Sequence, residues 1–378
     1  MSQAPVHRQN GVAAQWDALR WLHTFSSLPR VQKCRRLPNL QPDVEVRLRE
    51  AELRAHYVGL QTCGSVHACP MCGPRIMAGR ADELLYAIEH HDGDVIHVSL
   101  TARHHAGQSL KVLWDATTEA WTAVRKDREV EQLLGDDPLW AKRVEVTHGE
   151  NGWHPHVHAL LFVERGTDAD AIGHAMFEPW QTRLVSAGLD PPLRDSGGLF
   201  AKTLDLTEGA AAVADYVAKG TFPGAPLDQP SSAMRAALEL ASTQKLARRG
   251  NRTPFQLLVD AVTLGLFEDL ELWRTYEKES KGRRVSTWSS GARLRLLVGM
   301  LEASDAELAA STDHGGAAVC LVEKQAWPFI VATRDVPAAI LRAVEDAGQV
   351  EAGYHAAVAT VARLGFPGAV RRPRRLAE

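Results

Sequence analysis

The chain has 378 residues, of which 45% are hydrophobic and 24% charged, and its formal net charge is −3. At about 150 residues per domain, this length predicts two or three domains. No run of about 18 apolar residues appears and the N-terminus lacks the order of a signal peptide, so the pattern excludes a membrane protein and predicts a cytoplasmic one. Residues 1–80 carry 11 Lys and Arg against 5 Asp and Glu, a local net charge of +6 that favours binding to nucleic acid.

The first candidate metal site lies in a cysteine-rich segment near the N-terminus. Four of the five cysteines fall there: Cys34, Cys63, Cys69 and Cys72. An odd total in a long chain argues against a disulfide framework. Cys69 and Cys72 flank Pro70 in a tight turn, and four thiolates predict a closed, structural zinc site. His56 or His67 could replace one thiolate, and free buried cysteines are the alternative.

Helices and strands alternate through the middle of the chain. Their periodicities predict helices over residues 76–90, 110–134 and 167–187, and strands over residues 95–101 and 199–206.

A β-hairpin is expected over residues 144–163, with Gly-Glu-Asn-Gly as its turn. His156 and His158 are two residues apart, so both imidazoles emerge on one face of the second strand. Glu145 on the first strand can add an oxygen to these two nitrogens, a set that suits Mg²⁺ or Mn²⁺. The alternative is a chance pattern among 16 histidines. For His154, a supporting role behind the ligands and a contact to DNA both remain open.

The alanine-rich segment from Thr207 to Gly220 predicts a helix that Thr207 caps and Gly220 ends. Tyr216 and Lys219 lie three residues apart and therefore share one face of this helix. A packed tyrosine beside a solvated lysine is the ordinary explanation of such a pair.

A basic segment follows two further helices, expected to begin at Thr253 and to span residues 267–280. It holds three cations and an aromatic ring: Lys281, Arg283, Arg284 and Trp288. A basic turn with a stacking ring suits a nucleic-acid backbone, and a solvated charged loop is the alternative.

The last part of the chain carries no recognisable chemistry. Its pattern predicts strands over residues 317–322 and 329–332, helices over residues 336–347 and 351–364, and an unstructured basic tail at 371–375.

Taken in order, these motifs resemble the rolling-circle replication initiators of plasmids, members of the HUH endonuclease superfamily. The run Glu-x-Thr-x-Gly-x-x-Gly-Trp-His-Pro-His-x-His, from Glu145 to His158, is similar to the metal motif of that family. The cysteine stretch, the strand ending at Thr101 and the Lys-Gly-Arg-Arg-x-x-x-Trp-Ser segment resemble further family motifs. Because the Tyr-x-x-Lys pair follows the metal motif in the family's order, the resemblance makes Tyr216 the nucleophile, with Lys219 beside it.

The resemblance covers residues 30–288 and implies an α+β fold, with an HUH nuclease domain whose central antiparallel sheet is flanked by helices. The implied function is a replication initiator that nicks one strand at a plasmid origin and leaves a 5′-phosphotyrosine and a free 3′-hydroxyl primer. Mg²⁺ or Mn²⁺ would serve catalysis and Zn²⁺ would be structural. Implied partners are single-stranded or cruciform origin DNA and the host helicase and polymerase, with a dimer at the origin left open.

Two other classes of protein remain as alternatives. A zinc-containing DNA-binding regulator would use the cysteines and the basic segments but neither the histidines nor the tyrosine. A metal-dependent nuclease that uses water would keep the histidines and dispense with the tyrosine.

We expect four parts in the chain. Residues 1–90 form an N-terminal segment with the zinc cluster, and residues 91–225 form the HUH endonuclease domain. Residues 226–300 form a helical basic region for DNA binding, and residues 301–378 form a C-terminal α+β module with the basic tail.

Release of the DNA is the step at which this sequence departs from similar initiators. Some of them place a glutamate one helical turn before the tyrosine and others a second tyrosine one turn after it, but these positions hold Ala212 and Gly220. We expect Glu208 or Asp205 to activate water for release, or the tyrosine of a second protomer to act.

Overall fold

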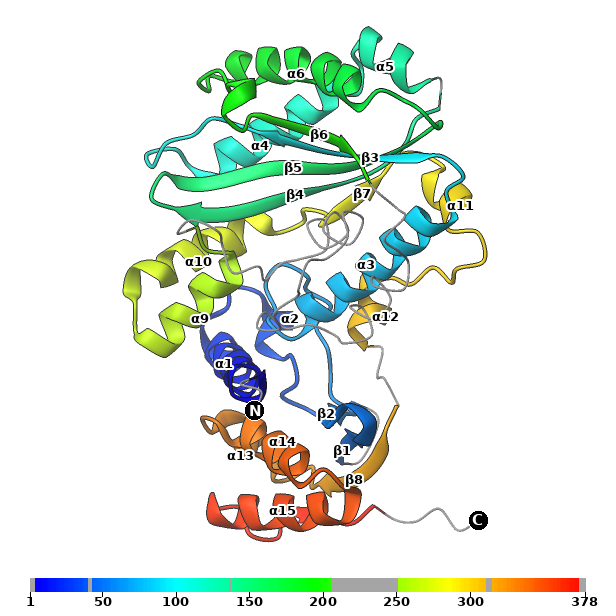
Figure 1. The fold of residues 1–378 in the computed structure, drawn as a ribbon. Helices are drawn as coiled ribbons and strands as arrows, with labels where there is room; N and C mark the ends of the chain where they lie inside the picture. The colour runs from blue at the N-terminus through cyan, green and yellow to red at the C-terminus, as the bar shows by residue number, and fades with distance from the viewer. Residues whose placement is uncertain (1–3, 40–42, 136, 205–250, 311–314, 374–378) are drawn as a thin grey trace. The chain divides into compact units, whose positions relative to one another are not determined.

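The computed structural model describes residues 4–39, 43–135, 137–204, 251–310 and 315–373 (Figure 1). These residues form two compact units, each described here by itself. The first unit comprises residues 1–76, 258–270 and 303–378, and the second comprises residues 77–257 and 271–302.

The first unit is built on a four-stranded antiparallel sheet in the order β2-β1-β8-β9. Its strands are β1 (Val44–Arg49), β2 (Arg54–Val58), β8 (Ala317–Val322) and β9 (Val370–Arg371). In β1 every second residue is buried, beginning with Val44, so one face of the strand lies in the core. Strands from the N-terminal and C-terminal parts of the chain therefore share one sheet.

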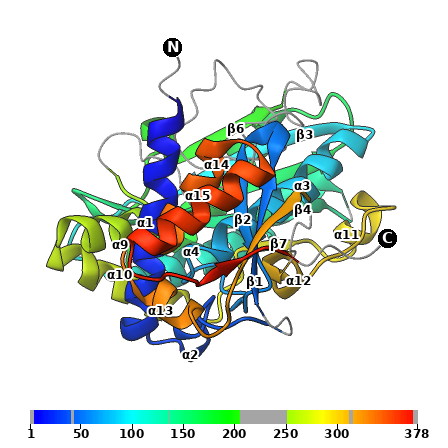
Figure 2. The same ribbon diagram turned by 90° about the horizontal axis from the view of Figure 1, so that it is seen from below.

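Helices complete the first unit. They are α1 (Ala4–Phe25), α2 (Pro29–Gln32), the 3₁₀ turn η1 (Glu50–Glu52), α12 (Asp305–Ala310), α13 (Trp327–Ala332), α14 (Val336–Ala347) and α15 (Val350–Arg363). Figure 2 shows α14 and α15 side by side across the strands, with α14 contacting β2 and α15 contacting β8.

Two predictions for the C-terminal part were wrong. Residues 329–332 form the end of helix α13 and not a strand, because Trp327, Ile330 and Val331 are buried at helical spacing and Pro328 occupies the first turn. Arg371 does not lie in an unstructured tail, since β9 pairs with β8 at Leu321.

The second unit holds a five-stranded antiparallel sheet in the order β6-β3-β5-β4-β7, which confirms the expected α+β class. Its strands are β3 (Asp94–Thr101), β4 (Leu139–Gly149), β5 (Gly152–Val163), β6 (Leu199–Thr203) and β7 (Ser286–Trp288). The predicted hairpin is the β4–β5 pair, in which Glu145 and His156 are Cα partners.

Two layers of helix cover this sheet. The elements are α4 (Leu110–Val124), α5 (Arg128–Leu134), α6 (Ala169–Ser186), η2 (Arg194–Ser196) and α11 (Ala292–Leu296). Helices α4 and α6 lie together on one face (Figure 1). Leu84 and Ile88 pack against Leu160 and Phe162 on the other face.

The division of the chain into two units falls within three helices, which are α3 (Cys72–His90), α9 (Pro254–Leu264) and α10 (Phe267–Ser280). Thr253 caps α9 as expected, since its hydroxyl accepts a hydrogen bond from the backbone N–H of Gln256 at 3.3 Å. The single helix expected over residues 110–134 is two helices, because Asp127 caps a new one and accepts from the N–H of Glu129 at 2.9 Å. No described helix is long and apolar enough to cross a membrane.

Candidate metal centres

The first candidate centre lies at the middle of the β4–β5 hairpin. The residues Glu145, His156 and His158 place their ligand atoms within 4.8 Å of one another. The Nε2 atoms of His156 and His158 lie 3.1 and 3.0 Å from the same carboxylate oxygen of Glu145. An ion with octahedral ligands at about 2.1 Å holds neighbouring ligand atoms about 3.0 Å apart, so this spacing fits adjacent positions around one divalent ion.

The electrostatics of this group, called the triad below, favour an anionic Glu145. Burial by itself opposes ionisation, but hydrogen bonds from His156 and His158 outweigh it and hold the pKa of the carboxyl well below its usual value. Glu145 therefore offers a charged oxygen beside two imidazole nitrogens at neutral pH. This donor set can hold a metal ion.

Two further histidines lie next to the triad, His154 on the same face of β5 and His104 in the loop after β3. The ring of His154 lies 4.9 Å from that of His156 and is stacked on His104 at 4.6 Å. Burial, followed by the nearby imidazoles of His156 and His104, lowers the pKa of His154 to about 3, so this ring is neutral. The sequence named His154, but His104 was missed because it lies in a loop and joins the row only through the fold.

The second candidate centre is the cysteine cluster of the first unit, made by Cys34, Cys63, Cys69 and Cys72. The Sγ atom of Cys34 lies 3.6 Å from those of both Cys69 and Cys72, and Cys63 lies 3.7 Å from Cys72. Thiolates around zinc at about 2.3 Å form a tetrahedron with edges of about 3.8 Å. The four sulfur atoms therefore already have the spacing of a tetrahedral site.

The turn chemistry of the Cys69–Cys72 pair follows the sequence prediction. The backbone N–H of Cys72 lies 3.4 Å from the Cys69 sulfur, and that of Ser65 lies 3.4 Å from the Cys63 sulfur. Burial and the neighbouring thiols raise the pKa of Cys69 well above its ordinary value. Four thiolates this close together, three of them buried, need positive charge beside them, so the cluster could bind a metal cation.

Two arginines supply part of that positive charge. Arg35 follows Cys34, is only 3% exposed and has a positive φ of 55°, an uncommon backbone conformation for a side chain of this size. Hydrogen bonds with the thiols of Cys34, Cys63 and Cys69 lower the pKa of Cys72, and the charge of Arg35 lowers it further. The pKa of Arg75 falls to about 9, chiefly through repulsion by Arg35. Neither arginine was singled out from the sequence.

The loop that carries Cys34 is held from two sides within the first unit. The indole N–H of Trp327 donates to the Arg35 carbonyl at 2.9 Å. The ring of His23 makes a 2.8 Å hydrogen bond to the Cys34 carbonyl. Both partners are buried, so a helix from each end of the chain fixes one cysteine of the cluster.

The residues predicted to contact DNA after α10 have different surroundings. Lys281 and Arg284 are exposed. The guanidinium of Arg283 pairs with Asp115 at 2.6 Å, and the half-buried Trp288 ring lies on β7, 6.3 Å from that of Phe162. A contact to DNA stays a prediction for all four.

Tyr216 and Lys219, together with Glu208 and Asp205, lie outside the described residues. Their roles therefore stay predictions from the sequence.

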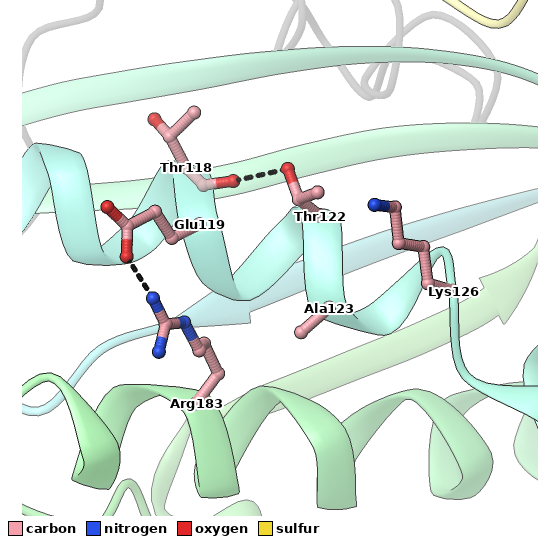
Figure 3. A pocket seen from close by; sticks show the side chains of 6 residues that line it. All are labelled: Thr118, Glu119, Thr122, Ala123, Lys126 and Arg183. Atoms are coloured by element: carbon pink, nitrogen blue, oxygen red, sulfur yellow. Dashed lines mark hydrogen bonds and ion pairs between the residues drawn. The ribbon is translucent and has the colours of Figure 1, made fainter.

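A surface pocket of about 320 Å³ lies on α4 and α6 (Figure 3). Glu119 and Arg183 form an ion pair across it. Trp121 of α4 packs edge-on against Trp140, which lies on the opposite face of β4 from Glu145 because strand residues alternate. The pocket is therefore on the other side of the sheet from the triad.

Two known proteins are similar in sequence. The protein described as "Protein rep" of Streptomyces lividans is 30% identical over 328 residues, which cover 68% of this chain and 69% of that protein. The "Neomycin resistance protein" of Streptomyces cyanogenus is 28% identical over 214 residues, 46% of this chain and 49% of that protein. This chain thus spans about half of the second relative. No family model and no solved structure matches.

Proposed function

The chain belongs to the family of the Streptomyces lividans Rep protein, and from this premise we propose that it initiates plasmid replication by nicking one strand of origin DNA. The observation that carries the proposal is the convergence of His156 and His158 on one oxygen of Glu145. Family membership and an open three-ligand set agree with an HUH endonuclease.

The triad would hold Mg²⁺ or Mn²⁺. Such an ion, when bound, would polarise the scissile phosphate and offset charge that develops on it. The carboxylate of Glu145 and the Nε2 atoms of the two histidines would fix its position, and the remaining positions would stay open to phosphate oxygens.

The nucleophile in this proposal is Tyr216. Its phenol oxygen would attack phosphorus while the bond to the 3′-oxygen breaks; the phenol loses its proton and the 3′-oxygen gains one. The products are a 5′-phosphotyrosine and a free 3′-hydroxyl that primes synthesis. Lys219 would hold a phosphate oxygen or stabilise the phenolate.

Zinc is the cation proposed for the cysteine cluster. Four thiolates satisfy a tetrahedral ion completely, so Cys34, Cys63, Cys69 and Cys72 would stabilise the first unit and take no part in cleavage. The basic balance of residues 1–80 and the exposed Lys281 and Arg284 would add contacts to the phosphate backbone.

The substrate would be single-stranded or cruciform origin DNA, because a tyrosine cannot reach a phosphate within an undistorted duplex. The host helicase and polymerase would then use the 3′-hydroxyl. For release of the DNA, Glu208 or Asp205 would activate water, or a second protomer would supply its tyrosine.

The test uses a labelled single-stranded origin oligonucleotide, Mg²⁺ or Mn²⁺ and a denaturing gel. Wild-type protein should give cleavage and a covalent band, Tyr216→Phe should lose the band while binding DNA, and Tyr354→Phe is the matched control. His156→Ala should lose cleavage at ordinary metal concentration. An adduct from Tyr216→Phe would overturn the tyrosine assignment. Cleavage without a band would indicate a water-using nuclease, and binding without cleavage a regulator.

A further inference from the structure

His97 of β3 lies beside His158 of the triad, on the neighbouring strand. His97 is 5% exposed, and its Nε2 atom lies 3.2 Å from Nδ1 of His158. His158 turns its other nitrogen, Nε2, toward Glu145 at 3.0 Å. Both nitrogens of this proposed metal ligand are thus engaged by named partners.

The strand register explains why His97 reaches this position. The Cα partner of His158 on β3 is Ser99, and His97 lies two residues away on the same face, which makes it a diagonal neighbour. On its other side, the ring of His97 meets Phe200 of β6 edge-on, with centroids 5.5 Å apart. The imidazole is therefore confined between two strands that flank β3.

The chemistry of His158 requires a partner that can both donate and accept. To bind an ion, Nε2 must present a lone pair, so the proton sits on Nδ1 and needs an acceptor. Without an ion, the Glu145 carboxylate takes a hydrogen bond from Nε2–H, and Nδ1 then needs a donor. A neutral imidazole at position 97 can act in either sense.

We propose that His97 is a positioning residue that holds His158 in the tautomer needed for metal binding. On binding, the proton on Nε2 of His158 leaves to solvent water, the shared proton passes from Nε2 of His97 to Nδ1 of His158, and a proton from solvent water replaces it at Nδ1 of His97. Two neutral imidazoles stand before and after, so the exchange is balanced. This inference rests on the proposed metal role of the triad.

The test compares two substitutions of nearly equal volume in the full chain. His97→Gln keeps a group that can donate or accept near the position of Nε2, whereas His97→Leu keeps bulk and removes both functions. Binding of Mn²⁺ is measured from the electron paramagnetic resonance signal of the free ion. His97→Leu should weaken Mn²⁺ binding about 10- to 100-fold, the usual cost of losing such a partner. His97→Gln should keep most of the affinity.

The control is His174→Leu, which removes an exposed imidazole bonded to the Asp170 carbonyl on α6. It should bind Mn²⁺ like the wild type. Equal weakening by Gln and Leu at position 97 would indicate a packing role and overturn the inference, as would unchanged binding in His97→Leu. If the wild type itself failed to bind Mn²⁺, the proposed metal role and this inference would both be overturned. If Mn²⁺ binding were lost in His156→Ala but not in His97→Leu, the proposed function would stand and this inference would be overturned.

A second measurement covers the case in which His97→Leu does not fold. Wild-type protein with ¹⁵N-labelled histidine is titrated with Mg²⁺, which is diamagnetic. The nitrogen spectrum should show that Nδ1 of His158 carries a proton and that Nε2 carries none once the ion is bound. An Nδ1 without a proton in the ion-bound state would overturn the inference.

Discussion

Trp327 offers a test of how the C-terminal segment supports the cysteine cluster. The residue is 0% exposed, and its indole N–H is the donor to the Arg35 carbonyl next to Cys34. Trp327→Phe keeps an aromatic ring against Tyr57, whose centroid lies 4.9 Å away, but removes the donor.

The expected cost has two parts. Full truncation of a buried aromatic costs about 3–5 kcal/mol, and phenylalanine keeps most of the volume, so we assign about 1–2 kcal/mol to lost packing. A buried carbonyl that loses its donor adds about 1–3 kcal/mol. The free energy of unfolding of the first unit should therefore fall by about 2–5 kcal/mol. Each 1.4 kcal/mol of stability lost from the Cys34 loop should speed zinc release about tenfold.

The assay is zinc release to a colorimetric chelator, together with thermal unfolding. Trp121→Phe is the matched control, because this buried indole nitrogen has no hydrogen-bond partner among the described residues. It should lower stability through packing alone and leave zinc release unchanged. If Trp327→Phe released zinc at the wild-type rate, the coupling between α13 and the Cys34 loop would be refuted.

Three further predictions concern charge and metal. Burial, with a smaller effect of Glu83, raises the pKa of Asp82 to about 6. The folded state then holds a proton that the unfolded state has lost above its own pKa of about 3.9, so stability falls as pH rises through this window. Asp82→Asn should raise the free energy of unfolding at pH 7 by about 1 kcal/mol, after discount for solvent screening, and by much less at pH 4; equal denaturant midpoint shifts at both pH values would contradict this. Mild chelation should stop nicking yet leave about one zinc per chain by elemental analysis, whereas joint loss of zinc and activity would count against two separate sites. Glu145→Ala should lose cleavage with Mg²⁺ and regain part of it with Mn²⁺, because two imidazoles remain, and equal rates with both ions would speak against this assignment.

The local features of both candidate centres were readable from the sequence. Alternation within one strand puts His156 and His158 on one face, and a glycine-bounded turn brings Glu145 opposite. Cys69 and Cys72 are close because only two residues separate them. In each case the spacing along the chain is short enough for backbone geometry to decide the outcome.

Features that depend on distant pairings were not readable. Nothing in the sequence indicates that Val44 pairs with Val322, yet this pairing brings Trp327 into the unit that holds Cys34. The apolar run at 329–332 was predicted as a strand because β-branched residues favour strands. The structure has a helix there, because the buried Trp327 and the following proline form its first turn. Tertiary packing overrode local preference there.

The two candidate centres differ in what they leave available to a substrate. Four sulfur atoms at tetrahedral spacing would use every position of a zinc ion, so a phosphate could enter only by displacing a thiolate. The triad supplies three donors, two of them 3.0 and 3.1 Å from the third, and an octahedral ion would keep about three positions for water or phosphate oxygens. In the proposed function, cleavage would therefore take place at the hairpin, where the ligand set is incomplete, and the cysteines would have a supporting role.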